Sequence, residues 1–69
     1  MNIAQLIIDE KYNNLRSDFY RLYMNNNWKA NKQEFQQILN ALKNIKGWQN
    51  EDRFVRLAEC CKVAIERCY

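Results

Sequence analysis

The sequence predicts an all-α fold, a small antiparallel three-helix bundle formed by residues 1–69 as a single domain. The 69 residues include no proline and a single glycine, Gly47, whereas an all-β fold needs many turn residues. The apolar residues recur at steps of three and four, which is the spacing of one face of a helix. Two short polar stretches, each with a tryptophan, separate three such segments.

The first helix is predicted over residues 3–25. Asn2 and Gln5 have the spacing of a capping box, in which each side chain accepts a hydrogen bond from the backbone N–H of the other. Three asparagines at residues 25–27 are expected to end this helix, because asparagine tolerates left-handed backbone and competes for backbone hydrogen bonds. The apolar stripe consists of Ile8, Tyr12, Leu15, Phe19, Leu22 and Tyr23.

The second and third helices are predicted over residues 32–46 and 51–68. Asn31 begins a second capping box, and Asn50 is placed to cap the third helix. Gly47 is suited to the left-handed conformation that often follows a helix. The stripes contain Phe35, Ile38, Leu39, Leu42 and Ile45 in the second helix and Phe54, Leu57, Ala58, Cys61, Ala64, Ile65 and Cys68 in the third.

The residues that usually carry chemistry are sparse. There is no histidine, and Cys60, Cys61 and Cys68 lack the paired spacing of a zinc site. Cys61 and Cys68 would lie about 10 Å apart on a helix, beyond the roughly 7 Å that a disulfide allows. No phosphate-binding loop or catalytic motif occurs. We therefore expect no enzyme, catalytic residue, cofactor or metal site.

The cysteines and the apolar runs also predict where the protein is located and whether it spans a membrane. An odd number of cysteines and the lack of a signal peptide favour a reducing compartment, so we expect a cytoplasmic protein. The longest apolar run, residues 6–8, is far too short to span a membrane.

A candidate partner-binding surface lies on the first helix. Its first turns are apolar almost all round, as in a buried helix, and Tyr20 and Met24 fall on the same side as Leu6. One alternative is that the third helix and Trp48 fold over these turns within one molecule. Trp28 and Trp48 are interpreted either as plugs at the ends of the bundle or as binding anchors. The predicted partner-binding residues are Ile3, Leu6, Ile7, Tyr20, Met24 and Trp28.

The predicted function is that of a small non-enzymatic protein-binding module, a regulator or inhibitor that docks on a larger protein or complex. A phage or mobile-element protein directed at a host defence or transcription complex is an example suggested by size and type alone. The same surface can instead pair two copies as a homodimer through the first helix.

The alternative function is a small nucleic-acid-binding or transcription-regulatory helical protein, with Lys29 and Lys32 beside Trp28 as the contacts. The net charge of +3 is modest for that role. The alternation of arginine with glutamate along the third helix would also repel phosphates, so protein binding is the preferred interpretation.

Two local spacings resemble known families. Residues 22–38 resemble the helix-turn-helix of a tetratricopeptide unit, with Trp28 after the turn, but they occur once and have Asn31 where that unit has a small residue. Arg56 and Cys60 have a spacing similar to the Arg-x-x-x-Cys of small enterobacterial regulators of the PerC kind.

Overall fold

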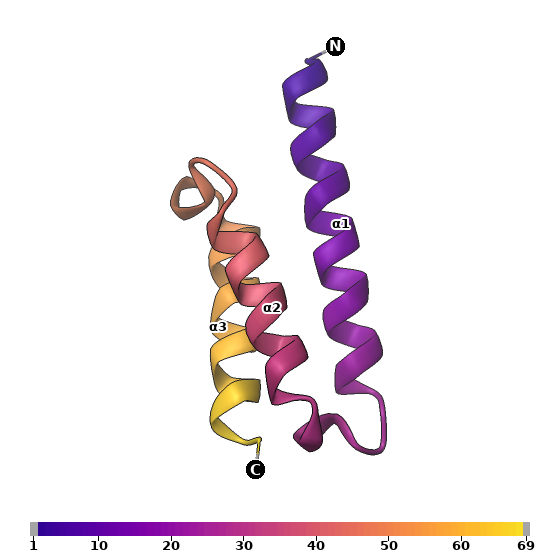
Figure 1. The fold of residues 1–69 in the computed structure, drawn as a ribbon. Helices are drawn as coiled ribbons and strands as arrows, with labels where there is room; N and C mark the ends of the chain where they lie inside the picture. Colours follow the sequence, from indigo (N-terminus) through magenta and orange to yellow (C-terminus); the bar gives the residue numbers. More distant parts are fainter. Residues whose placement is uncertain (1, 69) are drawn as a thin grey trace.

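The computed structural model describes residues 2–68, and this part of the chain forms three α-helices and no strand (Figure 1). The helices are α1 (Ile3–Tyr23), α2 (Lys32–Lys43) and α3 (Asp52–Glu66). Two short 3-10 helices, η1 (Trp28–Ala30) and η2 (Trp48–Asn50), lie in the turns between them. The all-α three-helix prediction is confirmed. In Figure 1 the chain reverses direction at each turn, so that α2 runs back beside α1 and α3 runs back along α2.

The predicted bounds were wrong at the C-terminal end of every helix. α1 and α3 each end two residues earlier than predicted and α2 three residues earlier, while α3 begins one residue later, at Asp52. The cause is the same in all three helices. The second residue after the end donates its backbone N–H to the carbonyl three residues back, which is the tight spacing of a turn. These residues are Asn25, Ile45 and Cys68, with bond lengths of 3.2, 3.1 and 3.1 Å.

The capping box at the start of α1 is half formed. The Asn2 side-chain oxygen accepts hydrogen bonds from the backbone N–H groups of Ala4 and Gln5, at 3.0 and 3.4 Å. The Gln5 side chain does not return the bond and instead donates to Asp9, one turn farther along, at 3.1 Å. Asn2 therefore satisfies two of the unpaired N–H groups that every helix start presents.

The other two predicted caps differ from the structure. Asn31 is the N-cap residue of α2, but its side chain makes no capping bond. Glu51 stands in the N-cap position of α3, because Asn50 is the last residue of η2. Gly47 does adopt the left-handed conformation predicted for it, with φ of 79°.

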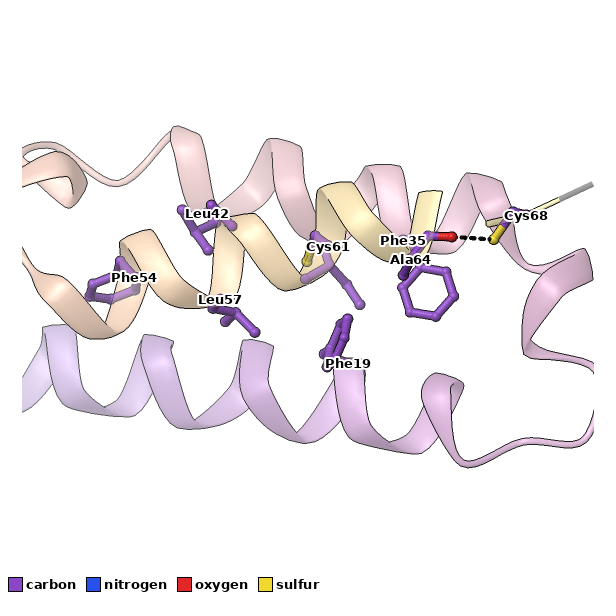
Figure 2. Packing of buried hydrophobic residues seen from close by; sticks show 10 residues of the cluster. Phe19, Phe35, Leu42, Phe54, Leu57, Cys61, Ala64 and Cys68 are labelled. Atoms are coloured by element: carbon purple, nitrogen blue, oxygen red, sulfur yellow. Dashed lines mark hydrogen bonds between the residues drawn. The ribbon is translucent and has the colours of Figure 1, made fainter. Parts of the chain in front are cut away.

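The core lies between the three helices and is formed mainly by α3, as the close view in Figure 2 shows. Phe35 and Leu42 of α2 and Phe54 of α3 are completely buried. Within residues 2–68, α1 contributes one buried side chain to the core, Phe19, and otherwise only half-buried ones. α1 is thus attached along one side only. The buried core residues are Phe19, Phe35, Ile38, Leu42, Phe54, Leu57, Ala58, Cys61, Ala64 and Cys68.

Candidate functional site

The difference in helix length leaves the first turns of α1 uncovered. At 1.5 Å per residue, α1 is about 31 Å long, whereas α2 and α3 are about 18 and 22 Å. In Figure 1 the N-terminal end of α1 extends past the turn that joins α2 to α3. Any apolar side chain on these turns therefore faces solvent unless something outside residues 2–68 covers it.

Five of the six predicted partner-binding residues are exposed, and we call these five the outer surface of α1. Met24 follows Leu6 by five full helical turns and lies on the same side of α1, whereas Tyr20 lies at the edge of that side, where it also borders α3. The exposed fractions are 72% for Ile3, 48% for Leu6, 50% for Ile7, 52% for Tyr20 and 77% for Met24.

The alternative in which α3 and Trp48 cover the first turns of α1 is wrong. α3 begins beside the third turn of α1, where the Tyr12 and Phe54 rings meet edge to face at 5.4 Å. Trp48 is half-buried and packs against the core, yet Ile3, Leu6 and Ile7 stay exposed. The cover expected for these turns is therefore absent from residues 2–68.

One ion pair marks the boundary between the covered and uncovered parts of α1. The Arg53 guanidinium of α3 donates a hydrogen bond to the Asp9 carboxylate and lies 5.0 Å from the centre of the Tyr12 ring. This bond, together with that from Gln5, lowers the pKa of Asp9 below its ordinary value of 3.8. Asp9 is thus ionised at neutral pH and connects α1 to α3 where the overhang begins.

Trp28 does not belong to the outer surface of α1. Its ring is half-buried, with its centre 4.9 Å from that of Tyr23 and 6.0 Å from that of Phe35. Its carbonyl oxygen lies 3.7 Å from the thiol of Cys68, which also donates to the Ala64 carbonyl at 3.0 Å. Trp28 closes the end of the bundle at which α1 ends and α2 begins.

The two lysines predicted as nucleic-acid contacts are exposed. Lys29 lies in η1 and Lys32 is the first residue of α2. Lys43 is the last residue of α2, about 17 Å from Lys32, and Lys46 lies in the turn beyond it. The lysines of the middle segment therefore do not form one continuous basic patch.

A groove between α1 and α3 was missed by sequence reasoning. Tyr23 and Val63 are 39% and 44% exposed, and with Tyr20 and Cys60 they line a hollow of about 370 Å³. A second hollow of about 370 Å³ shares Tyr20 and Cys60 with it and continues toward Arg53. The helical stripes gave little signal for this groove, because Tyr23 and Val63 sit at the edges of faces that were expected to pack.

The thiols differ in accessibility. Cys60 is exposed, whereas Cys61 and Cys68 are buried, and all three are free. Burial raises the pKa of Cys61 to about 11, so this side chain is a neutral thiol at physiological pH. In residues 2–68, no three histidine, cysteine or acidic side chains are grouped closely enough to hold a metal ion. No helix in the same range has the length and apolar character needed to cross a membrane.

Comparison with known proteins identifies no relative of this chain. The chain matches no protein-family model, and neither the curated proteins nor the solved structures contain a significant match. The functional inference therefore rests on the geometry of the outer surface of α1 and on the groove beside it.

Proposed function

We propose that this chain is a small non-enzymatic protein-binding module that docks on another protein through the outer surface of α1. The observation that carries the proposal is the overhang, where Ile3, Leu6 and Ile7 project from turns that α2 and α3 do not reach. Fully burying one such side chain contributes about 1.5–3 kcal/mol. A partner that covers the overhang thus gains most of its hydrophobic contact from these three residues.

In this proposal the module regulates or inhibits a larger protein or complex by occupying part of its surface. Exposed apolar patches interrupted by polar groups are typical of such contacts. Glu10, Asn13 and Ser17 provide the polar groups between the two apolar ends of α1. A phage or mobile-element protein acting on a host defence or transcription complex is one setting that fits the size and type.

The nucleic-acid alternative has less support. Specific nucleic-acid binding relies on a cluster or stripe of cations that neutralises several phosphates. Here the lysines of the middle segment lie at opposite ends of α2. Capture that depends on nucleic acid is therefore the outcome that would overturn the proposal.

The test is affinity capture with the tagged chain from a lysate of the cells that make it, with and without nuclease. Leu6→Asp places a charge in the overhang, and we expect it to abolish capture of the partner. Val63→Asp is the comparison variant, because Val63 is similarly exposed and lies in the groove between α1 and α3, which shares only Tyr20 with the outer surface of α1. Circular dichroism of both variants checks that the helices are intact.

The proposal is supported if one protein is captured in stoichiometric amount, survives nuclease and is lost with Leu6→Asp only. Capture that disappears with nuclease would instead identify a nucleic-acid-binding protein. Capture that is lost with Val63→Asp and unchanged with Leu6→Asp would place the docking site in the groove and overturn the assignment to α1.

A further inference from the structure

The groove between α1 and α3 consists of two hollows with different linings. The first, which we call the arginine hollow, has three guanidinium groups in its lining, those of Arg16, Arg53 and Arg56. The second, which we call the tyrosine hollow, is lined mainly by aromatic and apolar side chains, among them Tyr23 and Val63. Tyr20 and Cys60 line both hollows, so one ligand can occupy both at once.

Two of the three arginines have no acidic partner in the fold. Arg53 is bound to Asp9, whereas neither Arg16 nor Arg56 makes an ion pair within residues 2–68. Figure 1 shows α1 and α3 running in the same direction, and Arg53 lies over the ring of Tyr12. Arg16 and Arg56 each follow this contact by about one turn of their own helix, so they reach the same level of the groove. Like charges in one hollow repel each other, and an anion between them removes that repulsion.

The acids near the arginine hollow leave an excess of positive charge. Asp52 is the one acid among the described residues that line it, and Asp9 neutralises Arg53. Three guanidinium groups therefore face two carboxylates. Guanidinium groups bind carboxylates and phosphates through two parallel hydrogen bonds, so the remaining charge favours an anionic ligand of this kind.

The rings of the groove favour a peptide over single-stranded nucleic acid. A groove for single strands offers free ring faces on which bases stack. Here the Arg16 guanidinium lies over the Tyr20 ring at 5.3 Å, and Tyr23 is stacked on Phe19 with ring centres 5.6 Å apart. Glu59, which lines the tyrosine hollow, would also repel a phosphate backbone. An apolar side chain, in contrast, fits against the edges of these rings.

The length of the groove sets the length of the ligand. Tyr12 and Tyr23 line opposite ends of it on α1, which places the ends about 16 Å apart at 1.5 Å per residue. An extended chain covers this distance with about five residues. Arg16 and Tyr23 are about 10 Å apart by the same measure, which is about three extended residues. A matching segment therefore has an acid and an apolar side chain three residues apart.

We propose that the groove between α1 and α3 binds a short acidic segment of another protein, with a carboxylate between Arg16 and Arg56 and an apolar side chain in the tyrosine hollow. This site goes beyond the proposed function, because it shares only Tyr20 with the outer surface of α1. The contact buries far less than the roughly 1,600 Å² of a standard interface, so the dissociation constant should be about ten micromolar or weaker.

The test is the affinity of the purified chain for a fluorescently labelled peptide, measured by anisotropy. The peptide has seven residues, with two adjacent aspartates and a leucine three residues beyond them, and is made in both sequence orders. Replacing the aspartates by asparagines should weaken binding by about tenfold or more, because the arginines lose their anion. Replacing the leucine by serine should also weaken it by about tenfold, because the tyrosine hollow then stays empty.

Charge reversals in the chain locate the site. Arg16→Glu and Arg56→Glu should each weaken binding by about tenfold or more. Arg21→Glu is the matched control, because it changes the net charge equally but lies in a hollow between α1 and α2. Its effect should stay below about twofold, since salt screens distant charges. Circular dichroism checks the helices, and Arg16→Gln or Arg56→Gln replaces a reversal that unfolds the chain.

The exposed thiol gives an independent reading of occupancy. Cys60 lines both hollows and is exposed, whereas Cys61 and Cys68 are buried. Bound peptide should therefore slow the alkylation of Cys60 by iodoacetamide in proportion to the fraction bound. In a Cys60→Ser background, Gln33→Cys on the exposed part of α2 should react at the same rate with and without peptide.

Several outcomes would overturn the acidic segment as the ligand. One is no binding of either peptide at about 1 mM, and another is alkylation of Cys60 that bound peptide does not slow. An equal loss with Arg21→Glu would show general charge attraction without a site. Displacement of the peptide by inorganic phosphate or by a single-stranded oligonucleotide at lower concentration than by unlabelled peptide would assign the groove to a different ligand.

Failure of this inference is distinguishable from failure of the proposed function, because the peptide measurements do not involve Leu6. A chain that ignores the peptides but captures a protein through Leu6 would lose the groove site alone. A chain that binds the acidic peptide but captures nothing through Leu6 would keep the groove site and overturn the proposed docking through α1.

Discussion

The turn between α1 and α2 and the turn between α2 and α3 have matching backbone hydrogen bonds, twenty residues apart. In each turn the tryptophan N–H, of Trp28 or Trp48, donates to the carbonyl three residues before it, at 3.1 and 3.2 Å. The tryptophan carbonyl accepts from the N–H three residues after it, at 3.0 and 3.1 Å. The bundle therefore uses one turn twice, once at each end.

The two turns achieve this path with different side chains. In the first, the Asn25 side-chain oxygen accepts from the backbone N–H of Asn27 at 2.8 Å. In the second, Ile45 stands in the place of Asn25 and cannot accept such a bond. Gly47 stands in the place of Asn27 and takes a φ of 79°, where Asn27 has −108°.

The surroundings of the two turns differ more than the turns themselves. The Trp28 turn lies where α1 ends, and Trp28 packs in a ring cluster with Tyr23 and Phe35. At the Trp48 turn α1 does not end but continues past, and Trp48 has no ring partner in residues 2–68. The two turns thus share one pattern of backbone hydrogen bonds, whereas the neighbouring helix decides whether that end of the bundle is closed or leaves an apolar overhang.

The largest expected effect separates the two tryptophans. Trp28→Ala should lower the free energy of unfolding by about 3 kcal/mol, because it removes two ring contacts and leaves a cavity at the closed end. The loss caused by Trp48→Ala should be about 1–2 kcal/mol smaller, because Trp48 lacks these two ring pairs, each of which contributes roughly 0.5–1.5 kcal/mol. Urea denaturation followed by circular dichroism measures both. Equal losses would mean that the closed end is no better packed than the open one.

A smaller effect tests the backbone of the open-end turn. Gly47→Ala should destabilise by about 1 kcal/mol, because an L side chain strains a left-handed conformation even where space is free. Nothing lies within 4 Å of the added methyl position, so the backbone is the only source of strain. Asn27→Ala, at the matching position of the first turn, has negative φ and should change stability by less than about 0.5 kcal/mol. If the two variants unfold at the same urea concentration, the difference in φ has no energetic consequence.

The repeated turn explains where sequence reasoning succeeded and where it failed. The helices were predictable because their apolar spacing is strong, and Phe35, Leu42, Phe54 and Cys61 are buried as their stripes require. The helix ends were not predictable, because asparagine and lysine occur in helices and turns alike. The hydrogen bonds that end each helix also run between backbone atoms, which the side-chain pattern does not reveal.

The candidate surface, like the fold, was predictable from the sequence only in part. Exposure of Ile3, Leu6 and Ile7 follows from helix lengths, which the sequence carries. The groove exposing Tyr23 and Val63 depends on how far α3 stands from α1, which no residue pattern encodes. The twenty-residue spacing of Trp28 and Trp48 was the signal that would have revealed the repeated turn.

The smallest expected effect concerns the ion pair at the start of the overhang. Because Arg53 and Gln5 lower the pKa of Asp9 in the folded chain, its contribution to stability is present above pH 3.8 and is lost as the pH falls through the lowered value. Asp9→Asn removes this dependence, so the melting temperature of the variant should fall less steeply than that of the wild type below about pH 4. Glu10→Gln is the matched control, because Glu10 makes no ion pair within residues 2–68. Parallel acid profiles for wild type and Asp9→Asn would show that Arg53 does not connect α1 to α3 in solution, and that the overhang extends farther along α1 than Asp9.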